Sequence, residues 1–165
     1  MTTLESPQTD DELAASTRVL MVCSSGGHLA QLMTLRPWWS QRDVCWVTFA
    51  TEDGKSLLAG QRTVYAYHPT TRSLKNLVRN AVLAVRVLAR ERPDVIVTTG
   101  AGVALPFFVL GKLGRIPTVY IEVFDRIDHA PLTARLCKPF TSRMLVQWDE
   151  QQELYADSTV VGRLL

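Results

Sequence analysis

One stretch near the N-terminus decides the fold: Val19-Leu20-Met21-Val22-Cys23-Ser24-Ser25-Gly26-Gly27-His28-Leu29. An apolar run that stops at a small turn and resumes with helical spacing predicts a buried strand, a tight loop and the first turn of a helix. Glycines let the backbone approach a ligand closely, and the free N–H groups at a helix start favour an anion. An ordinary strand-to-helix turn needs the same residues, so this stretch alone predicts a fold and no ligand.

Outward from this stretch, strands and helices alternate along the chain. Strands are expected at residues 18–23, 44–49, 63–67, 95–98, 117–123, 142–147 and 159–161. Helices are expected at residues 29–39, within 51–58, from Ser73 as N-cap to about Glu91, from the turn at 99–102 to about Leu113, at 132–137 and at 150–155. This alternation predicts an α/β fold, a Rossmann-like doubly wound parallel sheet with helices on both faces.

Length and composition describe one soluble globular unit. The chain has 165 residues, of which 47% are hydrophobic and 21% charged, and a chain of this length can bury a substantial core. Residues 1–16 are polar and acidic and are predicted to be a disordered tail, so a single domain is expected over residues 17–165. The net charge of +2 argues neither for nor against nucleic acid, and the basic residues are not gathered in one run. No nucleic-acid partner is expected.

Several other classes of protein are disfavoured. The acidic N-terminal residues have the wrong charge for a signal peptide. The most apolar region, residues 103–123, is interrupted by Lys112, Arg115 and Pro117, so it does not predict a transmembrane helix and any membrane contact should be peripheral. No metal site is expected, because the histidines and the three cysteines are scattered and form no ligand motif.

Two loops of small residues follow predicted strands, at 24–28 and at 99–102. In a doubly wound sheet, ligands bind beyond the carboxyl ends of the strands, at the point where the strand order reverses. Neither loop is a complete Gly-x-Gly-x-x-Gly motif, and the acidic residue expected on a ribose has no clear counterpart. A dinucleotide site is therefore possible but not favoured.

The helix predicted from Ser73 carries a basic stripe. Its members lie within roughly 60° of one another at helical spacing and are Lys75, Arg79, Arg86 and Arg90. A basic stripe beside a broad apolar face suits anionic lipid headgroups, although a solvated face on a core helix would show the same pattern.

Several segments together resemble one protein family. They are Ser24-Ser25-Gly26-Gly27-His28-Leu29, Thr98-Thr99-Gly100-Ala101-Gly102-Val103-Ala104-Leu105-Pro106, Tyr120-Ile121-Glu122-Val123-Phe124-Asp125-Arg126, Val146-Gln147-Trp148 and Val161-Gly162-Arg163-Leu164. In this order they resemble the acceptor-side, membrane-associating subunits of split GT-B glycosyltransferases. That family includes bacterial PssD-type polysaccharide proteins and the membrane-anchoring subunit of the eukaryotic dolichol-linked GlcNAc transferase. The resemblance covers residues 18–165.

The resemblance implies a fold like the N-terminal half of a GT-B enzyme such as MurG. It implies a glycosyltransferase subunit that receives a polyprenyl-diphosphate-linked sugar in polysaccharide biosynthesis at the cytoplasmic face of the membrane. A PssE-like partner chain would bind the UDP-sugar donor, so no cofactor is expected on this chain, whose length leaves no room for a second Rossmann domain. Val123 and Asp125 depart from the small and apolar residues typical of the third motif.

The resemblance also implies roles for individual residues. A base must take a proton from the attacking sugar hydroxyl, and His28 and Glu122 are the candidates. Their alternatives are a packing role for His28 and a structural ion pair with Arg126 for Glu122. The candidates for binding the acceptor and its diphosphate are Ser25, Gly26, Gly27, Gly100, Gly102 and Arg126; for the glycines the alternative is tight turns alone.

Two surfaces complete the expectations. The partner-facing candidates are Gln147, Trp148, Tyr155, Gly162, Leu164 and Leu165, with packing on this domain's own core as the alternative. The membrane candidates are the basic stripe together with Phe107 and Phe108, which a core helix would explain equally well. Two rival functions also remain: a non-catalytic scaffold that recruits a transferase to the membrane, and a stand-alone nucleotide-binding enzyme.

Overall fold

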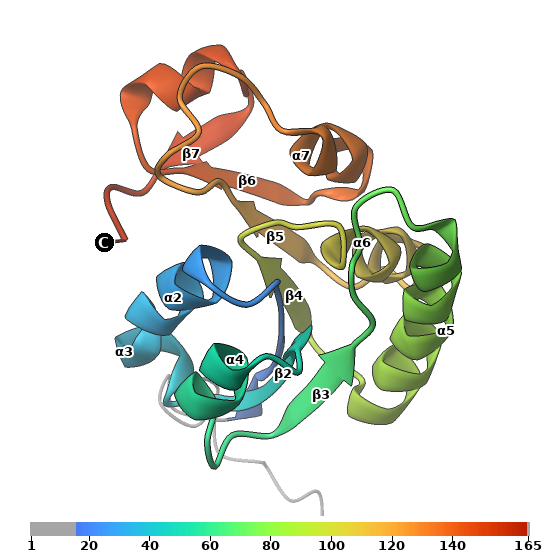
Figure 1. Ribbon diagram of the computed structural model, residues 1–165. Coiled ribbons are helices and arrows are strands. Elements are labelled where there is room, and N and C mark those ends of the chain that lie inside the picture. Colours follow the sequence, from blue (N-terminus) through green and yellow to red (C-terminus); the bar gives the residue numbers. More distant parts are fainter. Residues whose placement is uncertain (1–15, 165) are drawn as a thin grey trace, which may run out of the picture.

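The computed structural model describes residues 16–164, which form a seven-stranded, all-parallel sheet (Figure 1). The strand order is β3-β2-β1-β4-β5-β6-β7. The strands are β1 (Arg18–Val22), β2 (Asp43–Phe49), β3 (Thr63–Ala66), β4 (Val95–Thr98), β5 (Thr118–Ile121), β6 (Arg143–Val146) and β7 (Ser158–Val160). The predicted doubly wound parallel sheet is thereby confirmed, while the tail predicted for residues 1–16 falls almost wholly outside the described residues.

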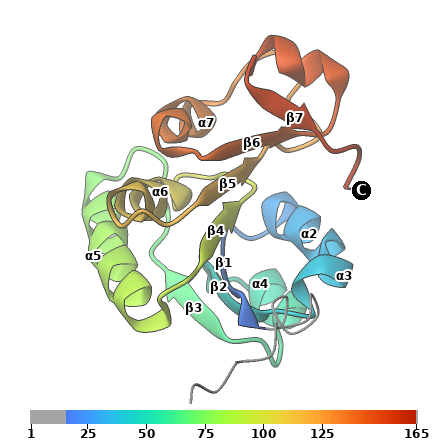
Figure 2. The ribbon, with the colours of Figure 1, turned by 180° about the vertical axis from the view of Figure 1, so that it is seen from behind.

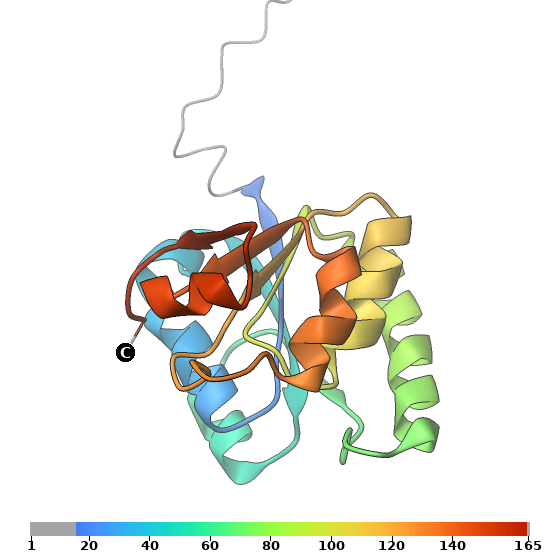
Figure 3. The ribbon, with the colours of Figure 1, turned by 90° about the horizontal axis from the view of Figure 1, so that it is seen from above.

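Helices cover both faces of the sheet, as the view from above shows (Figure 3). On one face lie α2 (Gly27–Thr34), α3 (Arg36–Trp39) and α4 (Glu52–Leu57). On the other lie α5 (Leu74–Glu91), α6 (Ala104–Leu113) and α7 (Leu132–Cys137), seen from behind in Figure 2. Two 3₁₀ helices, η1 (Lys138–Phe140) and η2 (Asp149–Glu153), flank β6.

The elements form where the sequence provides their signals. In β1, Leu20, Met21 and Val22 are fully buried, as expected for a strand covered on both faces. The single helix expected at 29–39 is instead two helices, with Pro37 in the first turn of α3. Because proline has no N–H and its ring clashes with the preceding turn, it cannot continue a helix but fits the first turn of a new one.

Helix α5 begins and ends at residues that stop a helix for physical reasons. The Ser73 hydroxyl accepts a hydrogen bond from the Asn76 N–H at 3.3 Å, which confirms the predicted N-cap. At the other end Arg92 adopts a left-handed conformation and Pro93 follows. Within the helix, the Asn80 amide bonds both the N–H and the carbonyl of Tyr67 at 2.9 Å, which fastens α5 to the end of β3.

The chain reverses its direction of winding at β1. Strand β1 pairs with β2 on one side and with β4 on the other, so the loops after β1 and β4 leave the carboxyl edge side by side. In open α/β sheets the crevice between two such loops is the usual ligand site.

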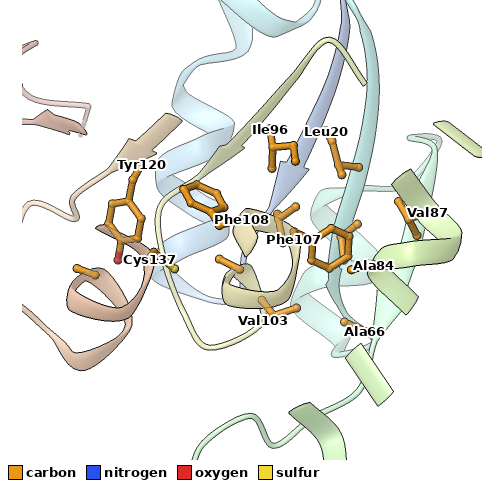
Figure 4. Packing of buried hydrophobic residues seen from close by; sticks show 14 of the residues in the cluster. Leu20, Ala66, Ala84, Val87, Ile96, Val103, Phe107, Phe108, Tyr120 and Cys137 are labelled. Carbon is orange, nitrogen blue, oxygen red and sulfur yellow. The ribbon is translucent and has the colours of Figure 1, made fainter. Parts of the chain in front are cut away.

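Helix α6 lies in the core. Figure 4 shows Phe107 beside Ala84 and Val87 of α5, and Phe108 close to Tyr120 of β5. Both phenylalanines are fully buried, and the Phe108 and Tyr120 rings meet edge to face with centroids 6.1 Å apart. The prediction that Phe107 and Phe108 contact lipid is therefore wrong: a helix that is apolar on every side is a buried helix.

Candidate active site at the carboxyl edge of the sheet

His28 lies in the first turn of α2 and is tied to the loop that follows β4. Its Nδ1 is 2.8 Å from the carbonyl oxygen of Thr99, and the Thr99 hydroxyl donates to the carbonyl of His28, also at 2.8 Å. Because a carbonyl can only accept, Nδ1 carries the proton and Nε2 keeps its lone pair. The two loops that the sequence analysis singled out are thus joined through this residue.

The surroundings of His28 favour its neutral form. Burial lowers the pKa of the imidazole below its ordinary value. Hydrogen bonding to Thr99 and the charge of Asp125 oppose that shift, while the charge of Arg126 adds to it. A neutral imidazole with a fixed tautomer and a free Nε2 can accept a proton from a hydroxyl group.

The glycine loop after β1 is held by a residue that the sequence analysis did not single out. The Asp53 carboxylate accepts a hydrogen bond from the Gly26 N–H at 2.8 Å. The nearby Thr51 side chain and the hydrogen bond from this N–H hold the pKa of Asp53 below its ordinary value. The predicted role of the Gly26 amide toward an acceptor is therefore wrong, because its proton is already donated within the protein. The available signal was the pair of acidic residues after β2, which ends at the same sheet edge.

The second glycine loop is shaped by packing. A Cβ on Gly100 would lie 2.6 Å from the Tyr120 hydroxyl and 3.4 Å from Cε1 of His28, and Gly100 has a φ of +109°. A Cβ on Gly102 would lie 3.1 Å from the Thr70 side chain. For Gly100 and Gly102 the close packing thus gives a physical reason for a glycine that does not depend on a bound acceptor. At Gly27, by contrast, a Cβ would meet nothing within 4 Å, and neighbouring Ser25 is half-buried.

Glu122 does not face the crevice. Its side chain is fully buried, one carboxylate oxygen accepts from the Val123 N–H at 3.0 Å, and the other accepts from the Tyr155 hydroxyl. Burial raises the pKa of this carboxyl. Both predictions for Glu122 are wrong: the side chain is closed off from an acceptor, and its hydrogen-bond partner is Tyr155 in place of Arg126.

Three buried glutamines connect the loop after β5 with α2 and with the C-terminal segment. Gln147 donates from Nε2 to the Gln31 side chain at 2.7 Å and to the Glu122 carbonyl at 2.9 Å. Its Oε1 accepts from the Leu164 N–H at 2.9 Å. Gln151 donates from Nε2 to the carbonyl oxygens of Val123 and Arg126. This network fixes the loop that carries the exposed Arg126. The three glutamines are far apart in the sequence and share no motif from which sequence reasoning could find the network.

The partner-facing candidates separate into two groups. Gln147 and Tyr155 are each 2% exposed, and their side chains make hydrogen bonds within the protein. The prediction that they contact a partner is therefore wrong. Trp148, Gly162 and Leu164 are half-buried, and Leu165 lies outside the described residues. The Arg163 guanidinium lies 5.1 Å from the Trp148 ring.

An apolar groove of about 400 Å³ adjoins this C-terminal segment. It lies on the face of the sheet that carries α2 and α3. Its walls include Trp38, Val97, Val119, Ile121, Val161 and Leu164.

The basic stripe of α5 lies at the surface. Lys75, Arg79, Arg86 and Arg90 are all exposed, and Arg79 stacks on the Tyr67 ring at 4.4 Å. Five large apolar side chains of the same helix are also exposed, between 38% and 74%: Leu74, Leu77, Val78, Val82 and Val85. In the described part of the chain, none of the helices combines the length and apolarity needed to cross a bilayer. Among residues 16–164, His, Cys, Asp and Glu side chains form no group of three that could hold a metal ion.

Comparison with known proteins identifies related sequences. A family model described as "Oligosaccharide biosynthesis protein Alg14 like" matches residues 50–164. The chain is 32% identical over 75 residues to a "UDP-N-acetylglucosamine transferase subunit alg14" of Schizosaccharomyces pombe, covering 42% of this chain and 36% of that protein. It is 24% identical over 178 aligned positions to the Candida albicans ALG14 subunit, covering 93% of this chain and 81% of that protein. The chain thus spans less than two fifths of the first relative and most of the second.

Solved structures share the fold. A MurG of Acinetobacter baumannii superposes with a TM-score of 0.72 and 17% identity, over 88% of this chain and 45% of that enzyme. A UDP-N-acetylglucosamine 2-epimerase of Rickettsia bellii superposes with a TM-score of 0.70 and 12% identity, over 90% and 45% of the two chains. Both likenesses confirm the Rossmann-like architecture, and the first confirms the predicted likeness to one half of MurG.

Proposed function

Because the chain belongs to the Alg14-like family of oligosaccharide biosynthesis proteins, we propose that it is the acceptor-binding, membrane-associating subunit of a two-chain, UDP-sugar-dependent glycosyltransferase. The acceptor is a polyprenyl-diphosphate-linked sugar, and the reaction takes place at the cytoplasmic face of the membrane. The observation that carries the proposal is His28, held by Thr99 with a free Nε2 at the winding reversal between β1 and β4.

His28 acts as the general base. As the acceptor hydroxyl attacks the anomeric carbon of the donor, a carbon–oxygen bond forms, the bond to UDP breaks and the hydroxyl proton moves to Nε2. The Thr99 carbonyl keeps the ring oriented and stabilises the imidazolium that results, because Nδ1–H remains bonded to it. A base with a lowered pKa is unprotonated, and hence ready, at neutral pH.

The acceptor diphosphate lies near the start of α2 in this proposal. The first N–H groups of a helix have no partner within the helix and attract anions, and Gly27 leaves open space for such a group. Arg126 adds a positive charge that acts on the same site, since it also contributes to the pKa of His28.

A partner chain supplies the UDP-sugar, as a PssE-like subunit would. The relatives are named as subunits, which supports a multi-chain enzyme. We assign this contact to Leu164, which lines the 400 Å³ groove, and to Trp148 and Gly162, with Leu165 as a further candidate. An apolar groove lined by the exposed ring of Trp38 suits a protein interface.

Helix α5 is the surface that we assign to the membrane. Exposed apolar side chains such as Val78 and Val85 border the exposed cations Arg79 and Arg86. Such a helix lies on anionic lipid with its apolar side toward the acyl chains.

The test is a transfer assay with this chain and a donor-binding partner chain, expressed together and singly. Transfer from UDP-sugar to a polyprenyl-diphosphate-linked acceptor should require both chains. His28→Ala should abolish transfer while the two chains still co-purify; a scaffold that only recruits the transferase would keep transfer in this variant. Transfer by this chain alone would support a stand-alone enzyme and contradict the proposal.

A further inference from the structure

The buried amide of Gln147 touches two regions that the proposed function assigns to different molecules. Gln147 directly follows β6 and is 2% exposed. On one side its Oε1 accepts a hydrogen bond from the N–H of Leu164, which lines the groove assigned to the donor-binding chain. On the other side its Nε2 donates to Gln31 of α2 and to the carbonyl of Glu122, directly after β5. One side chain therefore joins the partner contact to two elements of the candidate active site.

Both of these elements carry residues of that site. Gln31 lies on α2 one turn after His28, and its Oε1 also accepts from the Phe124 N–H at 3.3 Å. Phe124 lies in the loop after β5, two residues before Arg126. Gln31 and Gln147 thus tie the helix that carries the proposed base to the loop that carries the Arg126 charge.

Backbone N–H groups fix the direction of this hydrogen-bond chain at both ends. A backbone N–H can only donate, so Gln31 presents its oxygen to Phe124, and Gln147 presents its oxygen to Leu164. The nitrogen of Gln147 then faces the oxygen of Gln31 at 2.7 Å. Because a buried oxygen without a donor is costly, the position of Leu164 bears on how firmly Gln147 holds α2 and the loop after β5.

The neighbouring side chain makes a second link between the same two regions. Trp148 donates from Nε1 to the Phe124 carbonyl at 2.9 Å, and the Arg163 guanidinium lies 5.1 Å from its ring. The C-terminal segment, residues 161–164, follows β7 and lies beside α2 (Figure 1). A chain that docks on this segment and fixes it therefore also fixes the outer ends of both links.

We infer that Gln147 is a positioning residue that couples the docking of the donor-binding chain to the binding of the acceptor. The inference rests on the proposed function, because it takes the C-terminal segment as the partner contact and places the acceptor beside His28 and Arg126. Docking fixes Leu164, Leu164 fixes the Gln147 amide, and the amide holds α2 against the loop after β5. The complete enzyme then binds the acceptor more tightly than the single chain does, and by linkage the acceptor strengthens the contact between the chains by the same factor.

The test measures this coupling directly. The dissociation constant of the two-chain complex is determined with and without a saturating concentration of geranyl-diphosphate-linked N-acetylglucosamine, a short-tailed acceptor probe. In the wild type the probe should tighten the complex at least about fivefold, and the partner chain should tighten binding of the probe by the same factor. Equal dissociation constants with and without the probe would overturn the inference.

Two substitutions of Gln147 show whether the coupling passes through its amide. Gln147→Glu keeps an oxygen that accepts from Leu164 but loses the two protons donated toward Gln31 and Glu122. The two chains should associate as in the wild type when the probe is absent, and the probe should no longer tighten the complex. Gln147→Met fills a similar space without an amide and should also abolish the coupling.

Thr118→Val is the matched control for a loss of stability alone. Thr118 is fully buried at the opposite end of β5 and donates to the Phe140 carbonyl at 2.6 Å. Its replacement should lower Tm and leave the coupling factor unchanged, because this hydrogen bond lies at the amino edge of the sheet. Gln147 variants that lower Tm but keep the wild-type coupling factor would show a structural role only and would overturn the inference.

A measurement on the wild type keeps the test decisive if neither Gln147 variant folds. The Phe124 N–H, which Gln31 holds, should exchange with solvent at least about fivefold more slowly in the two-chain complex than in the single chain. Unchanged exchange would overturn the inference. Failure of the wild-type chains to associate, or of their complex to bind the probe, would instead refute the proposed function.

Discussion

Replacing Gly100 by alanine tests whether this glycine serves packing or the ligand. The new Cβ would lie 2.6 Å from the Tyr120 hydroxyl oxygen and 3.3 Å from Cζ of the same ring. The backbone φ of +109° is also one that alanine rarely adopts. Two separate costs are therefore expected in the folded state.

The magnitude follows from these two costs. A residue held in a sparsely populated backbone conformation costs about 1–3 kcal/mol, and overpacking a core costs about 1–3 kcal/mol. The free energy of unfolding should thus fall by roughly 2–6 kcal/mol, which lowers Tm by roughly 5–20 °C for a chain of this size. Thermal and urea unfolding followed by circular dichroism measure the loss.

A double variant separates the two costs. Tyr120→Phe removes the hydroxyl that the Cβ would strike, so in the Gly100→Ala background it should restore about 1–3 kcal/mol, the overpacking part alone. Gly27→Ala is the matched control, because a Cβ there meets nothing within 4 Å; its stability should stay near that of the wild type. If Gly100→Ala unfolds like the wild type but loses acceptor binding, the glycine serves the ligand and the packing argument is refuted.

Three further predictions concern the site. His28→Gln should lower kcat by about 10²–10⁴-fold without lowering Tm. Because burial lowers the pKa of His28, wild-type activity should fall only at pH values below the ordinary histidine pKa of about 6.5. A loss of activity that begins above this pH would contradict the assignment of His28 as the base. Asp53→Ala should lower kcat/KM roughly tenfold, because it removes the hydrogen bond that holds the Gly26 N–H. Glu52→Ala, which removes a neighbouring exposed carboxylate, should have no effect. Equal losses of kcat/KM in the two variants would refute the positioning role of Asp53. Folding raises the pKa of Glu122, so this carboxyl contributes most to the free energy of unfolding below its unfolded pKa of about 4.3. That contribution is lost as the pH rises through the pKa of the folded state. Tm of the wild type should therefore fall relative to Tm of Glu122→Gln between about pH 4 and 8, and the same pH dependence of Tm in both proteins would contradict this.

The fold was predictable because its signals are local and repeated. Apolar runs such as that ending at Cys23 alternate with helical patterns that have recognisable starts, such as Ser73. The break between α2 and α3 at Leu35 was not predicted. A proline near the end of an apolar helical pattern suggests the end of that helix, but Pro37 lies in the first turn of α3. The short helix expected at residues 150–155 is present as the 3₁₀ helix η2, and only its type was not predicted.

The site was predictable only in its location. Parallel strands bring their carboxyl ends to one edge, so the meeting of His28 with the loop at Thr99 follows from the topology. The direction of a side chain just beyond a strand does not follow from it. Glu122 turns inward because a hydroxyl 33 residues later, on Tyr155, is available to it, and the hold of Asp53 on Gly26 spans 27 residues. Such pairings become visible only in three dimensions.

We propose that this chain binds the acceptor and leaves the donor nucleotide to its partner. The most direct test is to titrate the isolated chain with a short-tailed prenyl-diphosphate-linked sugar and, separately, with UDP, while recording the NMR signals of the His28 ring. We expect saturable shifts of these signals with the acceptor analogue and none with UDP. Saturable binding of UDP at His28, with no response to the acceptor analogue, would contradict this division of roles.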